Sequence, residues 1–526
     1  MRSNLTRRGL IQLVGGGAGT AAAYATMQAM GLMAMPAAYA GTPELASGSG
    51  QGRHVVVLGA GIAGMVAAYE LAKADYTVTM LEATGRAGGR NRTYRGGDTI
   101  VEEGGTQLVD FDRDPDLYFN AGPARLPYHH EGILSYCREF GVDLEPIVND
   151  NRGAFFQDDA AFGGERIRNR QVINDGRGVI AEMLTKAVNK GALDDELSAL
   201  DKETFLDFVS SFGGLGDGTF AGTSRGGYAT APGSGLNAPG AYLPRLDMGE
   251  LLRSDFWGYK LHFGEGFTQA ATMMQPVGGM DQIVRAFVER VGPMIQRNAV
   301  VTEIRREGDG ARVVYTDATG ASRAVEAEHV VCTIPFAVLK DIDNDFSAPV
   351  RSAIAECHYV NACKAAFQAE RRFWELDDQV YGGISWVNDD ITHIWYPTAG
   401  LGREKGVIVG TYIWSDEIGA RFGEMPFGGR LEMVLAQGSK VHPSYRDDVV
   451  AGSSIAWHKV PFQHGGWAEW EGETRATAYP AVVAGDGPFH FAGEHMSYLT
   501  GWQEGSVLSA HDCVAAIGER TRTADL

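Results

Sequence analysis

His54 to Ala72 reads HVVVLGAGIAGMVAAYELA, and this stretch decides the fold. Its apolar run, Val55 to Leu58, is too short for a helix and predicts a buried parallel strand. Glycines at GxGxxG spacing follow it and open an Ala-rich helix. This order predicts a dinucleotide-binding turn whose backbone amides face a pyrophosphate. The predicted cofactor contacts of the turn are Gly59, Ala60, Gly61, Ile62, Ala63 and Gly64.

A second predicted strand, Tyr76 to Leu81, ends at Glu82, which Ala83 follows. The spacing places the Glu82 carboxylate where a ribose hydroxyl would lie, and a carboxylate there disfavours a 2′-phosphate. Next comes Gly-Arg-Ala-Gly-Gly-Arg, residues 85–90. Its paired glycines, including Gly89, free amides to face an anion, and Arg90 adds charge-assisted hydrogen bonds.

The end of the chain mirrors its beginning. Residues 489–494, Phe-His-Phe-Ala-Gly-Glu, predict a short apolar strand that ends in Gly493-Glu494. Residues 501–507, Gly-Trp-Gln-Glu-Gly-Ser-Val, then open the last predicted helix. Amides at this helix start are suited to contact a polar ligand.

Together these motifs resemble the flavin-containing amine oxidase family, and the resemblance covers nearly all of residues 53–520. It implies an α/β fold with a Rossmann-like, glutathione-reductase-type FAD domain and an α+β substrate domain of mixed sheet and helices. The FAD domain is expected in three segments, 53–120, 271–345 and 448–520. The substrate domain is expected at 121–270, which includes helices and a Gly/Ser-rich surface loop or lid at 213–240, and at 346–447. Within the FAD domain, residues 326–333 predict a single strand, and Gly104-Gly105 is expected near the flavin.

The resemblance also implies further FAD contacts. Aromatic side chains are expected beside the flavin, and backbone amides at the last helix are expected at its pyrimidine end. A core role for Trp457 stays open, because most tryptophans fill core. The cofactor contacts implied beyond the two N-terminal motifs are Gly122, Pro123, Ala124, Arg125, Val301, Trp457, Gly493, Glu494, Gly501, Trp502, Gln503 and Ser506.

One motif bears on how the flavin is held. Monoamine oxidases of the family attach FAD to a cysteine in a Ser-Gly-Gly-Cys motif. The corresponding stretch here is His464-Gly-Gly-Trp467. Because tryptophan stands where that cysteine would be, noncovalent FAD is expected.

Four residues bear on the substrate and its reaction. Gly122-Pro-Ala-Arg125-Leu-Pro resembles the Gly-Pro-Met-Arg-Leu-Pro run of L-amino acid oxidases, whose arginine binds the α-carboxylate. A planar guanidinium matches a carboxylate with two hydrogen bonds. The resemblance implies Tyr412 as a second carboxylate ligand, Trp502 beside the substrate, and Lys364 as the catalytic lysine that holds a water near flavin N5.

The sequence therefore predicts an FAD-dependent L-amino acid oxidase that forms a 2-oxo acid, ammonia and hydrogen peroxide from an L-amino acid and O2. Three alternatives stay open: a primary amine or polyamine oxidase, an amino acid 2-monooxygenase, and a non-catalytic flavin-binding protein. The side-chain preference is not fixed by the sequence, and a large neutral or broad range is the default expectation.

Composition and the N-terminus bear on location and partners. The formal net charge of −20 over 526 residues argues against nucleic acid or an anionic membrane as partner. Thr6-Arg7-Arg8-Gly9-Leu10, a weakly apolar stretch and Ala38-Tyr39-Ala40 predict a twin-arginine signal peptide at 1–40. We therefore expect a periplasmic or secreted protein with no stable membrane anchor after cleavage. The five scattered cysteines predict no metal site, and a homodimer is one option for the oligomeric state.

Overall fold

A computed structural model describes residues 41–524, so the predicted export signal at 1–40 lies outside the described residues. Its five-stranded sheet has the order β14-β2-β1-β18-β27, and all its pairings are parallel. The strands are β14 (Ile295–Arg297), β2 (Thr77–Glu82), β1 (His54–Leu58), β18 (His329–Cys332) and β27 (Phe489–Phe491). Three distant parts of the chain thus build one sheet, and the α/β fold class predicted from the sequence is confirmed.

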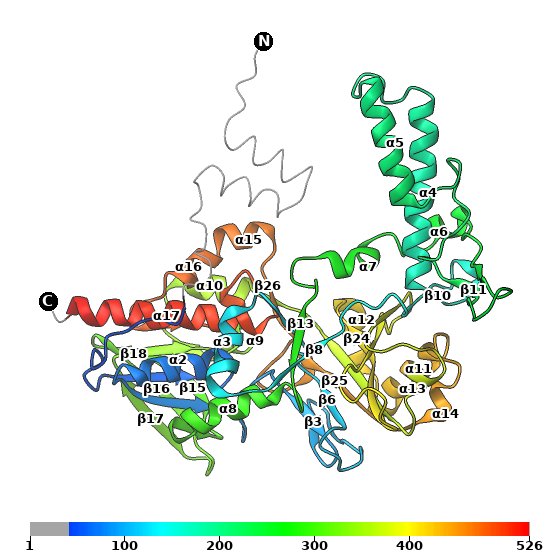
Figure 1. The fold of residues 1–526 in the computed structure, drawn as a ribbon. Helices are drawn as coiled ribbons and strands as arrows, with labels where there is room; N and C mark the ends of the chain where they lie inside the picture. Colours follow the sequence, from blue (N-terminus) through cyan, green and yellow to red (C-terminus); the bar gives the residue numbers. More distant parts are fainter. Residues whose placement is uncertain (1–40, 525–526) are drawn as a thin grey trace.

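Helices pack around this sheet (Figure 1). Helix α2 (Ile62–Lys73) lies between α17 (Gln503–Ala524) and α8 (Asp281–Val291), and α3 (Glu131–Phe140) contacts α17. Buried aliphatic side chains of β1, α2, α8 and α17 form one continuous core. Nine of the twelve residues of α2 are buried, which explains its apolar, Ala-rich sequence.

A smaller sheet covers one side of the parallel sheet. Its order is β17-β16-β15-β19, with β17 (Ser322–Ala327), β16 (Gly310–Thr316), β15 (Val300–Glu307) and β19 (Asp343–Asn344). The sequence pattern predicted a single strand from Glu326 to Thr333. The structure instead ends β17 at Ala327 and starts β18 at His329, because the two strands belong to different sheets.

A separate seven-stranded mixed sheet has the order β10-β9-β22-β23-β24-β21-β25. Its long strands β21 and β24 pair in antiparallel register, with Lys364 opposite Tyr412. The strands are β10 (Ile167–Arg168), β9 (Phe155–Gln157), β22 (Gly383–Val387), β23 (His393–Tyr396), β24 (Gly406–Ile413), β21 (Cys363–Ala369) and β25 (Val449–Ala456).

A buried ion pair joins residues 53–120 to this seven-stranded sheet. Glu102 ends β4 (Thr99–Glu102) and accepts two hydrogen bonds, at 2.9 and 2.8 Å, from Arg430 of α13 (Phe427–Gly438). The same carboxylate accepts the backbone N–H of Ala456 at the end of β25. The pair therefore fixes the end of the strand that precedes Trp457.

A helical pair, α4 (Asn169–Asn189) and α5 (Ala199–Gly213), projects from the body of the molecule (Figure 1). After α5, the Gly/Ser-rich stretch contains one short exposed strand, β11 (Tyr228–Thr230), as its composition predicted, and the exposed β12 (Ala241–Tyr242) follows it. Helices α6 (Met248–Arg253) and α7 (Tyr259–His262) lead back to the core. No helix within residues 41–524 combines the length and apolarity that crossing a bilayer needs.

The remaining elements are short. The strands are β3 (Thr93–Arg95), β5 (Gly105–Leu108), β6 (Tyr118–Asn120), β7 (Leu126–Pro127), β8 (Leu144–Ile147), β13 (Met273–Pro276), β20 (His358–Tyr359) and β26 (Ala468–Glu469). The helices are α9 (Phe336–Leu339), α10 (Ala348–Glu356), α11 (Phe373–Leu376), α12 (Asp416–Glu424), α14 (Tyr445–Asp448), α15 (Gly472–Thr477) and α16 (Tyr479–Val483).

Candidate active site

A cavity of about 420 Å³ opens at the carboxyl ends of the parallel strands. Gly59 and Gly61 follow β1, Glu82 ends β2, Thr333 follows β18 and Glu494 follows β27, and all of them line this cavity. Ligands of open α/β sheets bind at this edge. The cavity is therefore the candidate cofactor site.

The glycine turn leaves room for a ligand on one side and for the fold on the other. A Cβ on Gly61 would meet nothing within 4 Å, so the backbone there is open to the cavity. A Cβ on Gly64 would lie 2.1 Å from the Gly59 carbonyl oxygen, so only glycine lets α2 start this close to β1. These are the two properties that a pyrophosphate at a helix start requires.

Glu82 lies where the spacing predicted. Its carboxylate accepts the backbone N–H of Ala60 at 2.9 Å and the backbone N–H and hydroxyl of Thr84. A carboxylate has about four lone-pair sites, so it retains capacity for a ribose hydroxyl. The glycine turn and Glu82 therefore fit the ribose-pyrophosphate part of a dinucleotide.

The first and last motifs meet across the cavity. Arg90 donates to the Gly466 carbonyl at 3.0 Å and pairs with Glu494 at 2.9 Å. Glu494 also accepts the backbone N–H groups of Ala468 and Gly501. The ion pair holds the two motifs together, and the other guanidinium donors of Arg90 are available to a bound phosphate.

Most of the predicted cofactor residues line this cavity. Two of them lie behind it: the Ala60 amide is engaged by Glu82, and Gly64 packs on the turn. Two others, Ala124 and Arg125, line a neighbouring cavity instead. The predicted residues that line the cofactor cavity are Gly59, Gly61, Ile62, Ala63, Glu82, Ala83, Gly89, Arg90, Gly122, Pro123, Val301, Trp457, Gly493, Glu494, Gly501, Trp502, Gln503 and Ser506.

The neighbouring cavity has a volume of about 450 Å³ and brings Arg125 and Lys364 together with Tyr412. Tyr412 borders both cavities, so the three predicted substrate-site residues lie beside the cofactor site. Trp502, the fourth, borders the cofactor cavity, and its ring centroid lies 5.3 Å from the Arg125 guanidinium carbon.

Arg125 is a buried guanidinium surrounded by aromatic rings. It is 9 % exposed, and its guanidinium carbon lies 4.4 Å from the Trp395 ring centroid and 5.8 Å from that of Phe263. Within residues 41–524 no carboxylate forms an ion pair with it; the side-chain oxygen of Gln269 accepts from it at 3.0 Å, and its Nε has no acceptor. Burial lowers the pKa of Arg125 to about 10, so the group stays charged at neutral pH.

Lys364 is also buried, at 2 % exposure. Its Nζ donates to the carbonyl oxygens of Asn120, at 3.1 Å, and Gly122, at 2.6 Å, and lies 4.2 Å from the Tyr412 ring centroid. Burial and, to a lesser extent, the charge of Arg125 lower the pKa of Lys364 to about 7. An ammonium has three donors, so one is left for a group in the cavity.

Several cavity residues escaped the motif-based prediction. Thr333 lines the first cavity, and Trp395 and Asn120 line the second. Thr333 directly follows a parallel strand, so the rule that ligands bind at strand ends could have found it. The Gly104-Gly105 stretch, expected near the flavin, lines neither cavity. It starts β5, which lies beside β25, where the Gln107 side-chain oxygen accepts the backbone N–H of Ser454.

Comparison with known proteins agrees with this geometry. A family model described as flavin-containing amine oxidoreductase matches residues 62–518. The chain belongs to this family. The resemblance seen in the sequence is therefore confirmed, and a flavin is the cofactor that the family implies and the cavity fits.

Two relatives are named as amino acid oxidases. The flavin-dependent L-tryptophan oxidase RebO of Lentzea aerocolonigenes is 28% identical over 494 residues, covering 88% of this chain and 98% of the relative. The L-amino acid oxidase bordonein-L of Crotalus durissus terrificus is 27% identical over 478 residues, covering 87% and 85%. Cyclohexylamine oxidase from Brevibacterium oxydans IH-35A shares the fold, with a TM-score of 0.60 at 16% identity, covering 89% of this chain and 99% of that one.

Proposed function

We propose that this flavin-dependent amine oxidoreductase is an FAD-dependent L-amino acid oxidase, which converts an L-amino acid and O2 to a 2-oxo acid, ammonia and hydrogen peroxide. The observation that carries the proposal is Arg125. Within residues 41–524 this buried cation lacks a carboxylate partner and lies beside the cofactor cavity. A buried charge is costly unless it is paired, so its natural partner is a carboxylate of the substrate.

The surrounding residues suit this role. Arg125 would bind the α-carboxylate with two hydrogen bonds, and the Tyr412 hydroxyl would donate a third. Holding the carboxylate at this point directs Cα toward the cofactor cavity that Tyr412 borders. A bound flavin accepts a hydride and transfers the electrons to O2. Lys364, when protonated, places positive charge beside the site where oxygen gains negative charge.

The relatives RebO and bordonein-L are named as oxidases of amino acids, which supports an amino acid over a simple amine as the substrate. Cyclohexylamine oxidase shows that the same fold also accommodates amine substrates, so the alternative needs an experiment. A simple amine has no carboxylate, and an amine oxidase would leave Arg125 without a ligand. Amino acids and the amines formed by their decarboxylation therefore make a matched set of substrates.

The test is anaerobic flavin reduction by stopped-flow absorbance. We expect L-amino acids to reduce the flavin and the matched amines to be at least about a hundredfold slower, because losing the charged contact costs on the order of 2–5 kcal/mol. Arg125→Ala should retain flavin but lose most of this discrimination, and Arg125→Lys should keep part of it. Equal rates with amines, or a normal rate in Arg125→Ala, would overturn the proposal, and an amide product under air would favour the monooxygenase.

We further propose that FAD is bound noncovalently, because Trp467 stands in the cavity wall where the family's attachment cysteine would be. Acid precipitation should release intact FAD into the supernatant, and yellow colour retained in the pellet would contradict this. Export through the twin-arginine signal, to the periplasm or the medium, is also proposed. Mutation of Arg7 and Arg8 to Lys should keep the protein in the cytoplasm.

A further inference from the structure

Each of the three backbone carbonyl groups of residues 120–122 accepts a hydrogen bond from a side chain of the site. The Asn120 and Gly122 carbonyl oxygens accept from Lys364 Nζ, at 3.1 and 2.6 Å. Between them, the Ala121 carbonyl accepts from Trp457 Nε1 at 3.0 Å. Arg125 follows three residues later. The path of this short segment therefore sets where the Lys364 ammonium lies.

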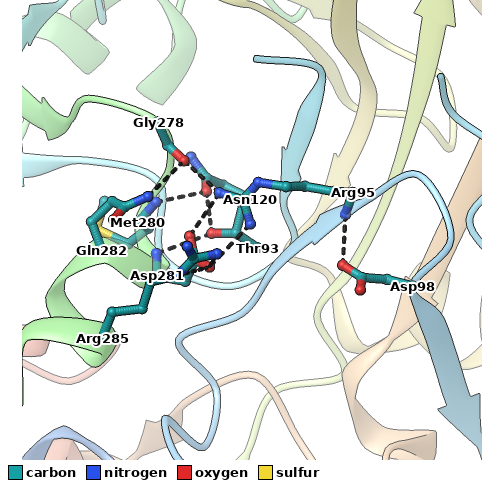
Figure 2. A network of polar contacts seen from close by, with 9 residues as sticks. All are labelled: Thr93, Arg95, Asp98, Asn120, Gly278, Met280, Asp281, Gln282 and Arg285. Carbon is teal, nitrogen blue, oxygen red and sulfur yellow. Dashed lines mark hydrogen bonds and ion pairs between the residues drawn. The ribbon is translucent and has the colours of Figure 1, made fainter. Parts of the chain in front are cut away.

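The side chain of Asn120 fixes one end of the segment (Figure 2). Its Oδ1 accepts the backbone N–H of Met280 at 3.0 Å and the hydroxyl of Thr93 at 2.7 Å. The Thr93 oxygen in turn accepts the backbone N–H of Asp281 at 3.1 Å. Two orphan N–H groups at the start of α8 are thus satisfied through Thr93 and Asn120, which face each other across β3 and β6.

An ion pair anchors this network from the other side. Arg95 donates to both carboxylate oxygens of Asp281, each at 3.0 Å, and also to the Gly278 carbonyl (Figure 2). Burial raises the pKa of Asp281, but hydrogen bonding to Arg95 and the charges of Arg95 and Arg285 outweigh burial, so its pKa lies below the ordinary value. The ion pair therefore fixes the N-terminus of α8 next to the Asn120 side chain.

We propose that Asn120 is a positioning residue for Lys364. Its side chain ties the carbonyl pair that holds the ammonium to the N-terminus of α8, and so sets the direction of the remaining Lys364 donor into the cavity. The proposal rests on the role of Lys364 in the proposed function. Asn120 has no charge and acts through the backbone that it fixes.

The geometry favours this role over general support of the fold. Asn120 lines the same cavity as Arg125, Lys364 and Tyr412, so a shift of its backbone moves atoms of the cavity wall. Lys364 is on β21 of the seven-stranded sheet, whereas Asn120 is on β6, outside that sheet. Their bond therefore joins two parts of the molecule at the point where the ammonium is needed, and a small misplacement there is expected to lower the rate.

The test measures the reaction of chemically reduced, FAD-loaded enzyme with O2, which needs no amino acid. Asn120→Ala should slow this reaction about five- to tenfold, the equivalent of one lost hydrogen bond. It should also move the pH at which the rate changes, because the ammonium loses a fixed acceptor. Thr93→Val should act in the same direction, and Thr93→Ser, which keeps the hydroxyl, should retain the normal rate.

The same substitutions in a Lys364→Met background separate positioning from support of the fold. We expect Asn120→Ala to have no further effect on the O2 reaction there, since the group that it positions is gone. Equal slowing in both backgrounds, or a normal rate in Asn120→Ala, would overturn the proposal, and so would a normal rate in Lys364→Met alone. Failure of the amino acid assignment would show separately, in the anaerobic reduction by substrate.

Discussion

Lys364 is a buried cation that lies near a second positive charge. It is buried, it shares a cavity with the guanidinium of Arg125, and its hydrogen bonds go to neutral carbonyl groups. Burial and that neighbouring charge lower its pKa from the ordinary 10.5 to about 7. A lysine with such a pKa changes charge within the pH range in which most enzymes are assayed.

This shift predicts a pH dependence of the reaction with O2. A protonated Lys364 stabilises negative charge on oxygen, so the rate should fall as pH rises through the lysine pKa. The negative charge of reduced flavin raises that pKa, so the inflection should lie between about 7 and the ordinary value. Stopped-flow reoxidation across this range checks it. Lys364→Met should be slow and independent of pH, whereas a wild-type rate that rises with pH would contradict the role.

At this scale, motifs predicted the residues that carry distinctive chemistry. Arg125, Tyr412 and Lys364 were assigned from the family resemblance, and the fold brings them to one cavity. Gln269 and Trp395, which contact Arg125, carried no such signal. Gln269 lies in the loop before β13 and Trp395 lies on β23, so their positions depend on tertiary packing over the site, which no local spacing encodes.

At the scale of elements, the β1–turn–α2 unit separates two uses of glycine. Gly64 serves the fold, because a Cβ there would lie 2.1 Å from the Gly59 carbonyl oxygen. Gly61 serves the ligand, because a Cβ there would meet nothing in the protein within 4 Å yet would project beside the cavity that it lines. The same substitution at the two positions should therefore have different effects.

We predict that Gly61→Ala folds normally but binds FAD at least about tenfold more weakly, because the methyl group occupies the approach of the pyrophosphate. Gly64→Ala should instead lower the thermal stability of the flavin-free protein, since α2 must move away from β1. Flavin titration and thermal unfolding of both variants check this. Identical behaviour of the two variants would show that the glycines do not divide their roles in this way.

Most elements of the parallel sheet could be predicted, since a buried strand followed by turn residues is a strong local signal. Val55–Leu58 and the strand before Glu82 are examples. The order β14-β2-β1-β18-β27 could be expected only from the family resemblance, because neighbours in this sheet come from distant parts of the chain. The prediction of one continuous strand across Ala327 and His329 was wrong for the same reason, since the sheet to which a strand belongs depends on tertiary packing.

Across the whole molecule, buried histidines are a shared feature. Burial, as the largest cause, lowers the pKa of His130, His490 and His495 to about 3 and that of His329 and His511 to about 4. All five are therefore neutral in the folded protein near pH 6. His329 and His490 are in contact, with 3.4 Å between their ring nitrogens, and the other three lie elsewhere in the fold, so the effect on stability is collective.

This distribution predicts acid sensitivity. The folded pKa values lie below the ordinary value of 6.5, so the unfolded chain binds more protons below that pH. The free energy of unfolding should fall as pH decreases through 6.5, by at most about 1.4 kcal/mol per pH unit for each histidine. Thermal unfolding between about pH 7.5 and about pH 5 measures the slope. His490→Gln should reduce the slope. A midpoint independent of pH would show that the unfolded chain takes up no extra protons on these groups.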